Sequence, residues 1–113
     1  MTIDRERFGE FASLPEAFWD ELIADMVSAT QEFFDGLEQF KRERSVCETR
    51  LHQHIHGYAS FVGYAGATKL RQALKTPTQR AMEGHLPDDE TIAQLKAIAD
   101  ATIATLHQCN PHT

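Results

Sequence analysis

Three histidines occupy alternate positions in the segment 52–56, and their side chains could perform two kinds of chemistry. If the segment is helical, His52 and His56 lie four residues apart on one face and could together bind Zn²⁺ or Ni²⁺. His54 would point elsewhere, and the segment offers no Asp, Glu or Cys as an obvious third ligand, so we expect no functional metal site. The second kind of chemistry is nucleophilic, because a neutral imidazole nitrogen can attack a phosphoryl group near neutral pH. Surface histidines without a role are the alternative.

His56 differs from the other two histidines in the small residues expected on its helical face. Ala59, Ser60 and Gly63 follow it by three, four and seven positions, which places them on the same side of a helix. A glycine in a helix interior costs about 0.5–1 kcal/mol relative to alanine, so Gly57 and Gly63 need a reason other than helix stability. A bare surface around an exposed nucleophile would let another molecule come within bonding distance.

A spaced pattern of small and apolar residues follows His56. Two, three, four, ten, eleven and fourteen positions later stand Tyr58, Ala59, Ser60, Gly66, Ala67 and Leu70. The pattern resembles the signature of histidine-containing phosphotransfer (HPt) domains of two-component phosphorelays, which has an apolar residue, Lys, a small residue, Gly, Ala and Leu at those positions. Only the Lys is replaced. Counting from either of the other two histidines puts Val62 or Tyr64 at the glycine position, so His56 is the register that fits.

The resemblance implies a function and a set of partners. His56 would accept a phosphoryl group from the phosphoaspartate of a receiver domain of a response regulator and pass it to another receiver, in a relay that includes a hybrid sensor histidine kinase. The receiver would hold the Mg²⁺, and the chain itself would need no cofactor. It would be a phosphohistidine carrier rather than an enzyme. The surface for docking the receiver would consist of Gly57, Ala59, Ser60, Gly63 and Tyr64.

Ala59 stands where the family has Lys, and this departure leaves two interpretations open. In the first, the charge of the phosphoryl group is neutralised by another side chain, for which His52, Lys69 and Arg71 are the candidates. In the second, the chain is a non-catalytic HPt-like module that binds a receiver or kinase without accepting phosphate. Neither includes autokinase activity, because the sequence has no Gly-rich phosphate loop for a nucleotide.

Length and charge limit the other classes of function. The 113 residues are 42% hydrophobic, which suits one domain over 1–113 with a modest core. Eleven Lys and Arg against 17 Asp and Glu give a net charge of −6, which argues against a nucleic-acid partner. The sequence has no apolar run long enough for a membrane span, and its charged N-terminus does not resemble a signal peptide, so we expect a cytoplasmic protein. We also expect it to be a monomer. Cys47 and Cys109 make no disulfide framework, and Cys47 is expected to be a buried thiol on the apolar side of its helix.

Apolar periodicity predicts an all-α fold, an antiparallel four-helix bundle with a short extra N-terminal helix. Two Ser-x-x-Glu capping boxes, beginning at Ser13 and Ser45, are expected to start the long helix and the histidine helix. Pro77 should interrupt the fourth helix, which would kink or restart near Thr76. The expected helical segments are 3–11, 14–40, 46–62, 67–82 and 92–106.

Overall fold

The computed structural model describes residues 3–112 and confirms the all-α fold class. Within these residues there is no strand. The helices, in chain order, are α1 (Arg5–Phe11), α2 (Glu16–Arg42), α3 (Glu48–Tyr64), α4 (Thr68–Ala73), α5 (Lys75–Ala81) and α6 (Asp89–Cys109).

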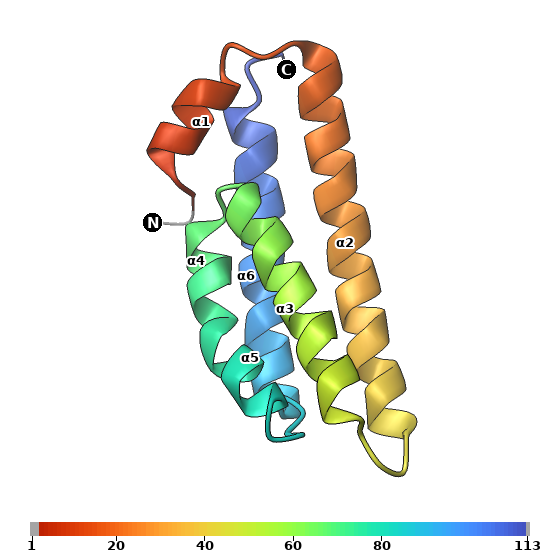
Figure 1. The fold of residues 1–113 in the computed structure, drawn as a ribbon. Coiled ribbons are helices and arrows are strands. Elements are labelled where there is room, and N and C mark those ends of the chain that lie inside the picture. Colours follow the sequence, from red (N-terminus) through yellow and green to blue (C-terminus); the bar gives the residue numbers. More distant parts are fainter. Residues whose placement is uncertain (1–2, 113) are drawn as a thin grey trace.

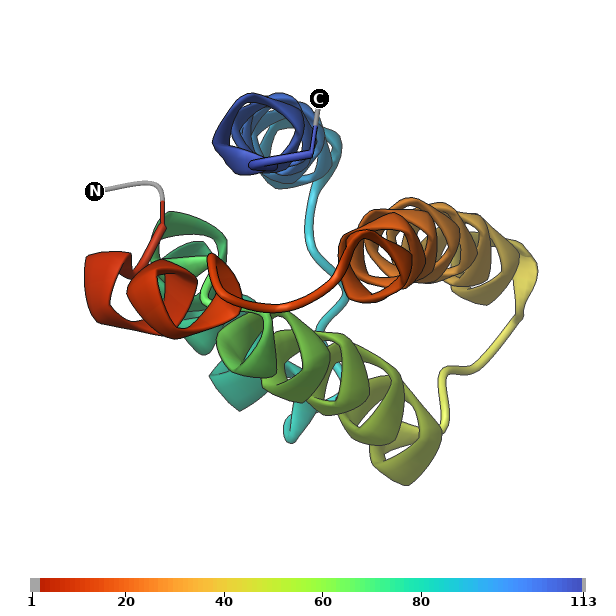
Figure 2. The ribbon, with the colours of Figure 1, turned by 90° about the horizontal axis from the view of Figure 1, so that it is seen from above.

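Four helical columns make the bundle. In Figure 1, α2 runs down, α3 returns upward, α4 and α5 follow one another down a single column, and α6 runs up again. Seen from above, the four columns surround a common centre and α1 lies beside one end (Figure 2). α3 packs against α2 on one side and the α4–α5 column on the other, and α6 closes the ring. The bundle measures 47 × 22 × 21 Å, so a site on α3 lies on a long side.

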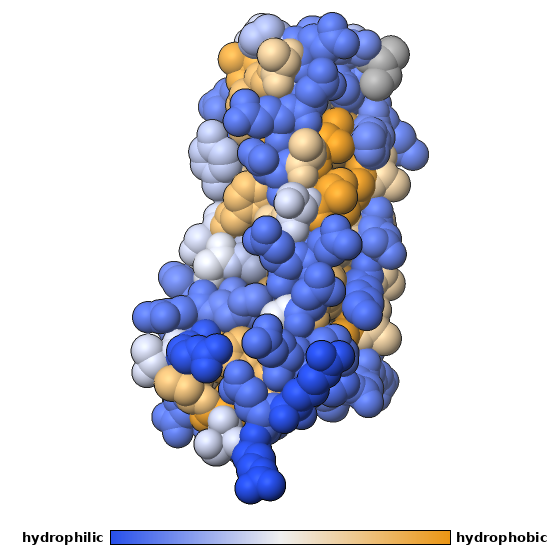
Figure 3. Space-filling model, turned by 90° about the vertical axis from the view of Figure 1, so that its right-hand side faces the viewer, coloured by the Kyte–Doolittle hydropathy of each residue, from blue (hydrophilic) through white to orange (hydrophobic). Residues whose placement is uncertain are grey.

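The broad apolar stripe of α2 supplies much of the core. Trp19, Met26 and Leu37 are fully buried, at positions set by the predicted helical period. The opposite face of α2 is charged, and the view onto this side of the molecule shows mainly hydrophilic side chains, with hydrophobic patches between them (Figure 3). Within the described residues, no helix combines the length and hydrophobicity needed to cross a membrane.

α1 closes one end of the bundle. Asp4 caps it by accepting hydrogen bonds from the amides of Glu6 and Arg7 at 3.0 and 3.2 Å. The rings of Phe8 and Phe11 pack against Trp19, with centroids 5.9 and 6.5 Å from the indole. This confirms the short N-terminal helix as a part of the fold.

Both predicted capping boxes are wrong. The Ser13 hydroxyl donates to the Glu10 carbonyl at 3.0 Å, and so belongs to the end of α1 rather than the start of α2. α3 begins at Glu48, which makes Glu48 the first helical residue instead of the third, as a box starting at Ser45 requires. Neither α2 nor α3 has a hydrogen-bonding side chain at its N-cap.

The later start of α3 also overturns the prediction for Cys47. This residue is the N-cap of α3 and is exposed, because it precedes the first helical turn and is not carried round to the apolar side. Cys109, the last residue of α6, is exposed as well.

The fourth column is broken where Pro77 predicted. α4 ends at Ala73, and α5 restarts at Lys75, so that Pro77 falls in the first turn of α5, where its missing N–H costs no helical hydrogen bond. Leu74 lies between the two helices with φ −85° and ψ −8°. The Leu74 amide still donates to the Leu70 carbonyl, and the Leu74 carbonyl accepts from the Thr78 amide, so the two pieces share one column.

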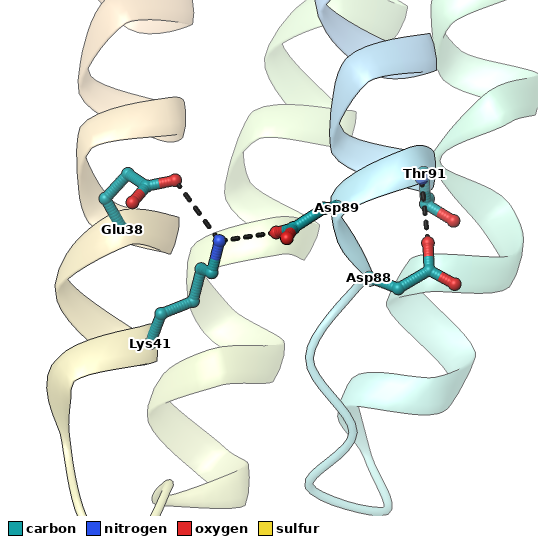
Figure 4. Close-up of polar contacts among 5 residues, drawn as sticks. All are labelled: Glu38, Lys41, Asp88, Asp89 and Thr91. Atoms are coloured by element: carbon teal, nitrogen blue, oxygen red, sulfur yellow. Dashed lines mark hydrogen bonds and ion pairs between the residues drawn. The ribbon is translucent and has the colours of Figure 1, made fainter.

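A polar cluster ties the start of α6 to the end of α2 (Figure 4). The Lys41 ammonium lies 2.5 Å from the Asp89 carboxylate and 3.6 Å from that of Glu38. The hydrogen bond to Asp89 raises the pKa of Lys41 above its ordinary value, because the charged form is favoured. Asp88 caps α6 by accepting a hydrogen bond from the Thr91 amide at 2.8 Å.

Candidate functional site

His56 projects into solvent from the middle of α3. The apolar side of the helix, formed by Leu51, Ile55, Tyr58 and Val62, is buried against the core. His56 lies on the opposite side and is exposed, as the spacing predicted. A rigid helix therefore holds an accessible imidazole away from the core.

His52 lies parallel to His56, one turn earlier on α3. The two rings stack with their centroids 5.4 Å apart and an angle of 9° between their planes. Across the part of the chain that the structure describes, no group of three or more His, Cys, Asp or Glu side chains could hold a metal ion. The pair therefore offers two imidazole ligands and no third. That its role is not metal binding stays a prediction.

His54 is a packing residue between α3 and α2. Its Nε2 lies 2.8 Å from the Phe33 carbonyl oxygen, and its ring stacks on the Phe33 ring with centroids 5.4 Å apart. Gly36 makes room for it, since a Cβ there would lie 2.3 Å from a ring carbon of His54. Of the three histidines, His54 thus faces inward and fixes the rotation of α3, while His56 faces outward.

An open hollow of about 480 Å³ lies beside His56, between α3 and the α4–α5 column. One wall carries the small side chains of Ala59 and Ser60. The other carries two cations, Arg71 of α4 and Lys75 of α5. The complete lining is His56, Ala59, Ser60, Arg71, Lys75, Thr78 and Gln79.

The glycines predicted for the docking surface have different surroundings. Gly57 is exposed, and a Cβ there would meet nothing within 4 Å, so it leaves open surface next to His56. Gly63 is half-buried, and a Cβ there would lie 3.0 Å from Cδ of Arg71 and 3.2 Å from its Nε. Gly63 therefore accommodates the Arg71 side chain, a packing role that the sequence did not reveal.

Tyr64 and Lys69 are exposed but differ in their relation to the hollow. The Tyr64 ring is 57% exposed at the end of α3, with the Arg7 guanidinium 5.9 Å from its centroid. Lys69 stands two residues before Arg71, which places it roughly 200° around α4. Among the described residues, the lining of the hollow includes neither of them. Of the three candidates for charge neutralisation, only Arg71 lines the hollow, and His52 stacks on the imidazole.

Lys75 is the residue that the sequence analysis missed. It follows Arg71 by four positions, a spacing that puts two side chains on one helical face. That spacing was the available signal, but it could not be connected to His56 without knowing how the α4–α5 column is rotated against α3.

The Gly-Ala-x-x-Leu part of the pattern builds the turn that brings this column back. Gly66 has a positive φ of 79°, and the amides of Gly66 and Ala67 donate to the carbonyls of Gly63 and Val62, which ends α3 in a Schellman motif. Ala67 and Leu70 are buried behind it. These residues therefore place Arg71 and Lys75 beside His56, rather than taking part in chemistry themselves.

Comparisons of the chain with family models, with curated proteins and with solved structures gave no match. What the site can do therefore follows from its geometry and from the resemblance in the sequence pattern.

Proposed function

We propose that this chain is a phosphorelay carrier of the HPt type, which accepts a phosphoryl group on His56 from the phosphoaspartate of a receiver domain and passes it to another receiver. It acts in the cytoplasm as a monomer. The chain contributes the nucleophile and the docking surface, while the receiver contributes the phosphoryl group and the Mg²⁺.

One observation carries the proposal: an exposed imidazole on a rigid helix is bordered by small side chains and by two cations. Phosphoryl transfer depends mostly on in-line positioning and on neutralising charge, and less on covalent chemistry by the protein. Ala59 and Ser60 leave space for the approaching receiver, and Arg71 and Lys75 bring positive charge to the same hollow. The receiver would contact the surface that Gly57, Ser60 and Tyr64 present.

Each transfer exchanges one bond to phosphorus for another. A ring nitrogen of neutral His56 forms a bond to phosphorus while the bond between phosphorus and the aspartyl oxygen breaks, and the aspartate leaves with the electron pair as a carboxylate. The other ring nitrogen of His56 keeps its proton. In the return step a carboxylate oxygen of a second receiver's aspartate attacks the same phosphorus, and the bond between phosphorus and nitrogen breaks, with its electron pair returning to the imidazole of His56. Because no nucleotide takes part, this chain needs neither a phosphate loop nor kinase activity.

The test uses purified receiver domains labelled on aspartate with radioactive acetyl phosphate in the presence of Mg²⁺. Incubation with this chain should move the label onto it as an acid-labile, alkali-stable modification. His56→Gln should remain unlabelled, while His52→Gln and His85→Gln should still accept label. If the parent takes no label from any receiver of its own organism, or if His56→Gln is labelled as strongly as the parent, the proposal is wrong.

Position 59 favours a second candidate. Ala59 removes the Lys that the HPt pattern places one turn after the histidine, and an HPt-like bundle without that charge could bind a receiver or kinase and block it without accepting phosphate. Binding measured by calorimetry, together with no label on the chain, would identify this function. If the chain binds the receiver and also takes up label, even slowly, the result would instead favour the carrier function.

A further inference from the structure

Arg71 and Lys75 are two uncompensated cations in a negatively charged chain. Within the part of the chain that the structure describes, neither makes an ion pair, and both line the hollow beside His56. The chain carries a net charge of −6, so carboxylates are plentiful. Two cations left unpaired at the side of an exposed histidine are a site for an anion.

The structure also provides a reason for the position of Arg71. If residue 63 had a Cβ, that atom would lie 3.0 Å from Cδ and 3.2 Å from Nε of Arg71. The Arg71 side chain therefore rests against the bare backbone of α3 at Gly63. A larger residue at position 63 would push the guanidinium away from that helix. Gly63 thus lets a cation from α4 reach across to the face that carries His56.

Lys75 stands at the break in the fourth column. It is the first residue of α5, four residues after Arg71, and both side chains line the hollow beside His56. The helix restarts here because of Pro77, two residues later. Arg71 and Lys75 therefore approach one hollow from two separate helices.

We propose that Arg71 and Lys75 together bind the phosphoryl group carried on His56, in place of the Lys that the HPt pattern has at position 59. The inference rests on the proposed function and extends it by naming the groups that hold the phosphoryl oxygens. A guanidinium offers a planar fork of donors to these oxygens, and an ammonium adds a point charge. Thr78 and Gln79, on the same wall, supply uncharged hydrogen-bonding groups.

The first arm of the test measures transfer from a phosphorylated receiver to Arg71→Gln, Lys75→Gln and the double variant. Loss of one charge-assisted contact should slow transfer about tenfold. Lys69→Gln is the matched control, because it removes the same charge from α4 at a position that does not line the hollow; it should stay within about twofold of the parent. The charge-conserving change Lys75→Arg should restore most of the rate, whereas Arg71→Lys should restore only part of it, because an ammonium lacks the planar fork of donors. Circular dichroism establishes that each variant is folded.

The second arm needs no receiver. Phosphoramidate, a small phosphoryl donor, modifies histidine directly, and phosphorus NMR then follows the titration of each phosphohistidine. The chain has six histidines, so the signal of His56 is identified as the one missing from His56→Gln. Cations beside the phosphoryl group favour its dianion, so the midpoint of this titration should move to higher pH in Lys75→Gln and Arg71→Gln but not in Lys69→Gln.

The two arms separate failure of the inference from failure of the proposed function. If the parent accepts no phosphate from receivers, the carrier function is rejected, while the NMR midpoints still decide whether the two cations bind the phosphoryl group. If Arg71→Gln and Lys75→Gln match the parent in rate and in midpoint, the inference is overturned even though transfer occurs. If Lys69→Gln has the same effect as Lys75→Gln, net charge alone is responsible, and the inference is again overturned.

Discussion

Gly36 of α2 lies beneath the imidazole ring of His54 of α3, so closely that a Cβ on Gly36 would come within 2.3 Å of the ring. The ring is held there by its contact with the Phe33 carbonyl oxygen at 2.8 Å and by stacking on Phe33. Because His54 and His56 are two residues apart, they point to opposite sides of α3. The contact that draws His54 inward therefore also turns His56 outward.

Replacing Gly36 by Ala should destabilise the fold. The ring of His54 packs against Phe33 and Phe40 and would lose these contacts if it moved aside, and overpacking of this kind costs about 1–3 kcal/mol, against a gain of about 1 kcal/mol in helix propensity. Urea denaturation should show a net loss of about 1 kcal/mol. Gly57→Ala, in open surroundings, is the control and should raise the free energy of unfolding by about 0.5–1 kcal/mol. Equal stabilisation by both changes would contradict the packing role of His54.

Ser60→Gln should leave the fold intact and slow phosphotransfer. Ser60 is exposed on the wall of the hollow next to His56, so a longer side chain would stand in the path of the receiver. A displacement of about 1 Å in a reacting complex can cost on the order of a hundredfold in rate. The measurement is the initial rate of label transfer, with Gln94→Arg on the exposed side of α6 as the control that should change neither rate nor stability. A folded Ser60→Gln that transfers at the parent rate would show that the receiver does not approach over this face.

Gly63 also belongs to the docking surface predicted from the sequence, so a bulky residue there would be an alternative test. The contact with Arg71 makes that substitution a poorer test, because the new side chain would also displace the cation. A slower Gly63→Gln would combine two effects, whereas Ser60→Gln isolates the docking surface.

Tyr58 should make the fold sensitive to alkali. Burial, with a smaller contribution from the charge of Asp100, raises the pKa of Tyr58 above its ordinary value of 10.0, against the opposing effect of its hydrogen bond with Thr30 at 2.8 Å. The neutral phenol is thus favoured in the fold, so its contribution to stability is complete below pH 10 and is lost as pH rises through the raised pKa.

Tyr58→Phe provides the measurement. At neutral pH it should lower the free energy of unfolding by about 1 kcal/mol, because Thr30 loses its partner. Above pH 10 its stability should fall less steeply than that of the parent, since there is no phenol at position 58 to ionise on unfolding. The free energy of unfolding of each protein is measured by urea denaturation at a series of pH values. If it falls in parallel for the two proteins at alkaline pH, this explanation of the pH dependence is contradicted.

Asp88 should give a corresponding effect in acid. Hydrogen bonding from the Thr91 side chain, and from the Thr91 amide, lowers the pKa of Asp88 below its ordinary value of 3.8, so the cap stabilises α6 above that pH and its contribution is lost as pH falls through the lowered pKa. Asp88→Ala should melt at a lower temperature than the parent at pH 7, and the difference should shrink as the pH is reduced below 3.8. Glu90→Ala, which removes a charge from the same first turn without removing the cap, is the control. An unchanged difference at low pH would mean that the carboxylate is not the group that caps α6.

The sequence was sufficient for the fold and for the direction of His56, because both follow from periodicity. The burial of Ile55, Tyr58 and Val62 on one side of α3 determines which side His56 occupies. The break at Pro77 was also predictable, since it depends on a local property of proline.

Features that depend on the exact start of a helix or on contacts between helices were not predictable. The exposure of Cys47 and the failed cap at Ser45 both follow from a start of α3 about two residues later than the periodicity suggested. The position of Lys75 in the hollow, and the packing of Arg71 on Gly63, depend on the rotation of one helical column against another. Nothing in the local sequence specifies that rotation, because it is set by core packing across the bundle.

The break at Leu74 has a consequence for how such a protein can change over evolutionary time. Each residue turns an α-helix by about 100°, so one residue inserted or deleted between Arg71 and Lys75 would swing Lys75 away from the hollow. Lys75 is the first residue of α5, whose Pro77 and Ala81 are buried, so the same change would also turn these core residues away from the core. Burial of α5 therefore keeps the length of the joint constant across lineages, and with it the cation that faces the histidine.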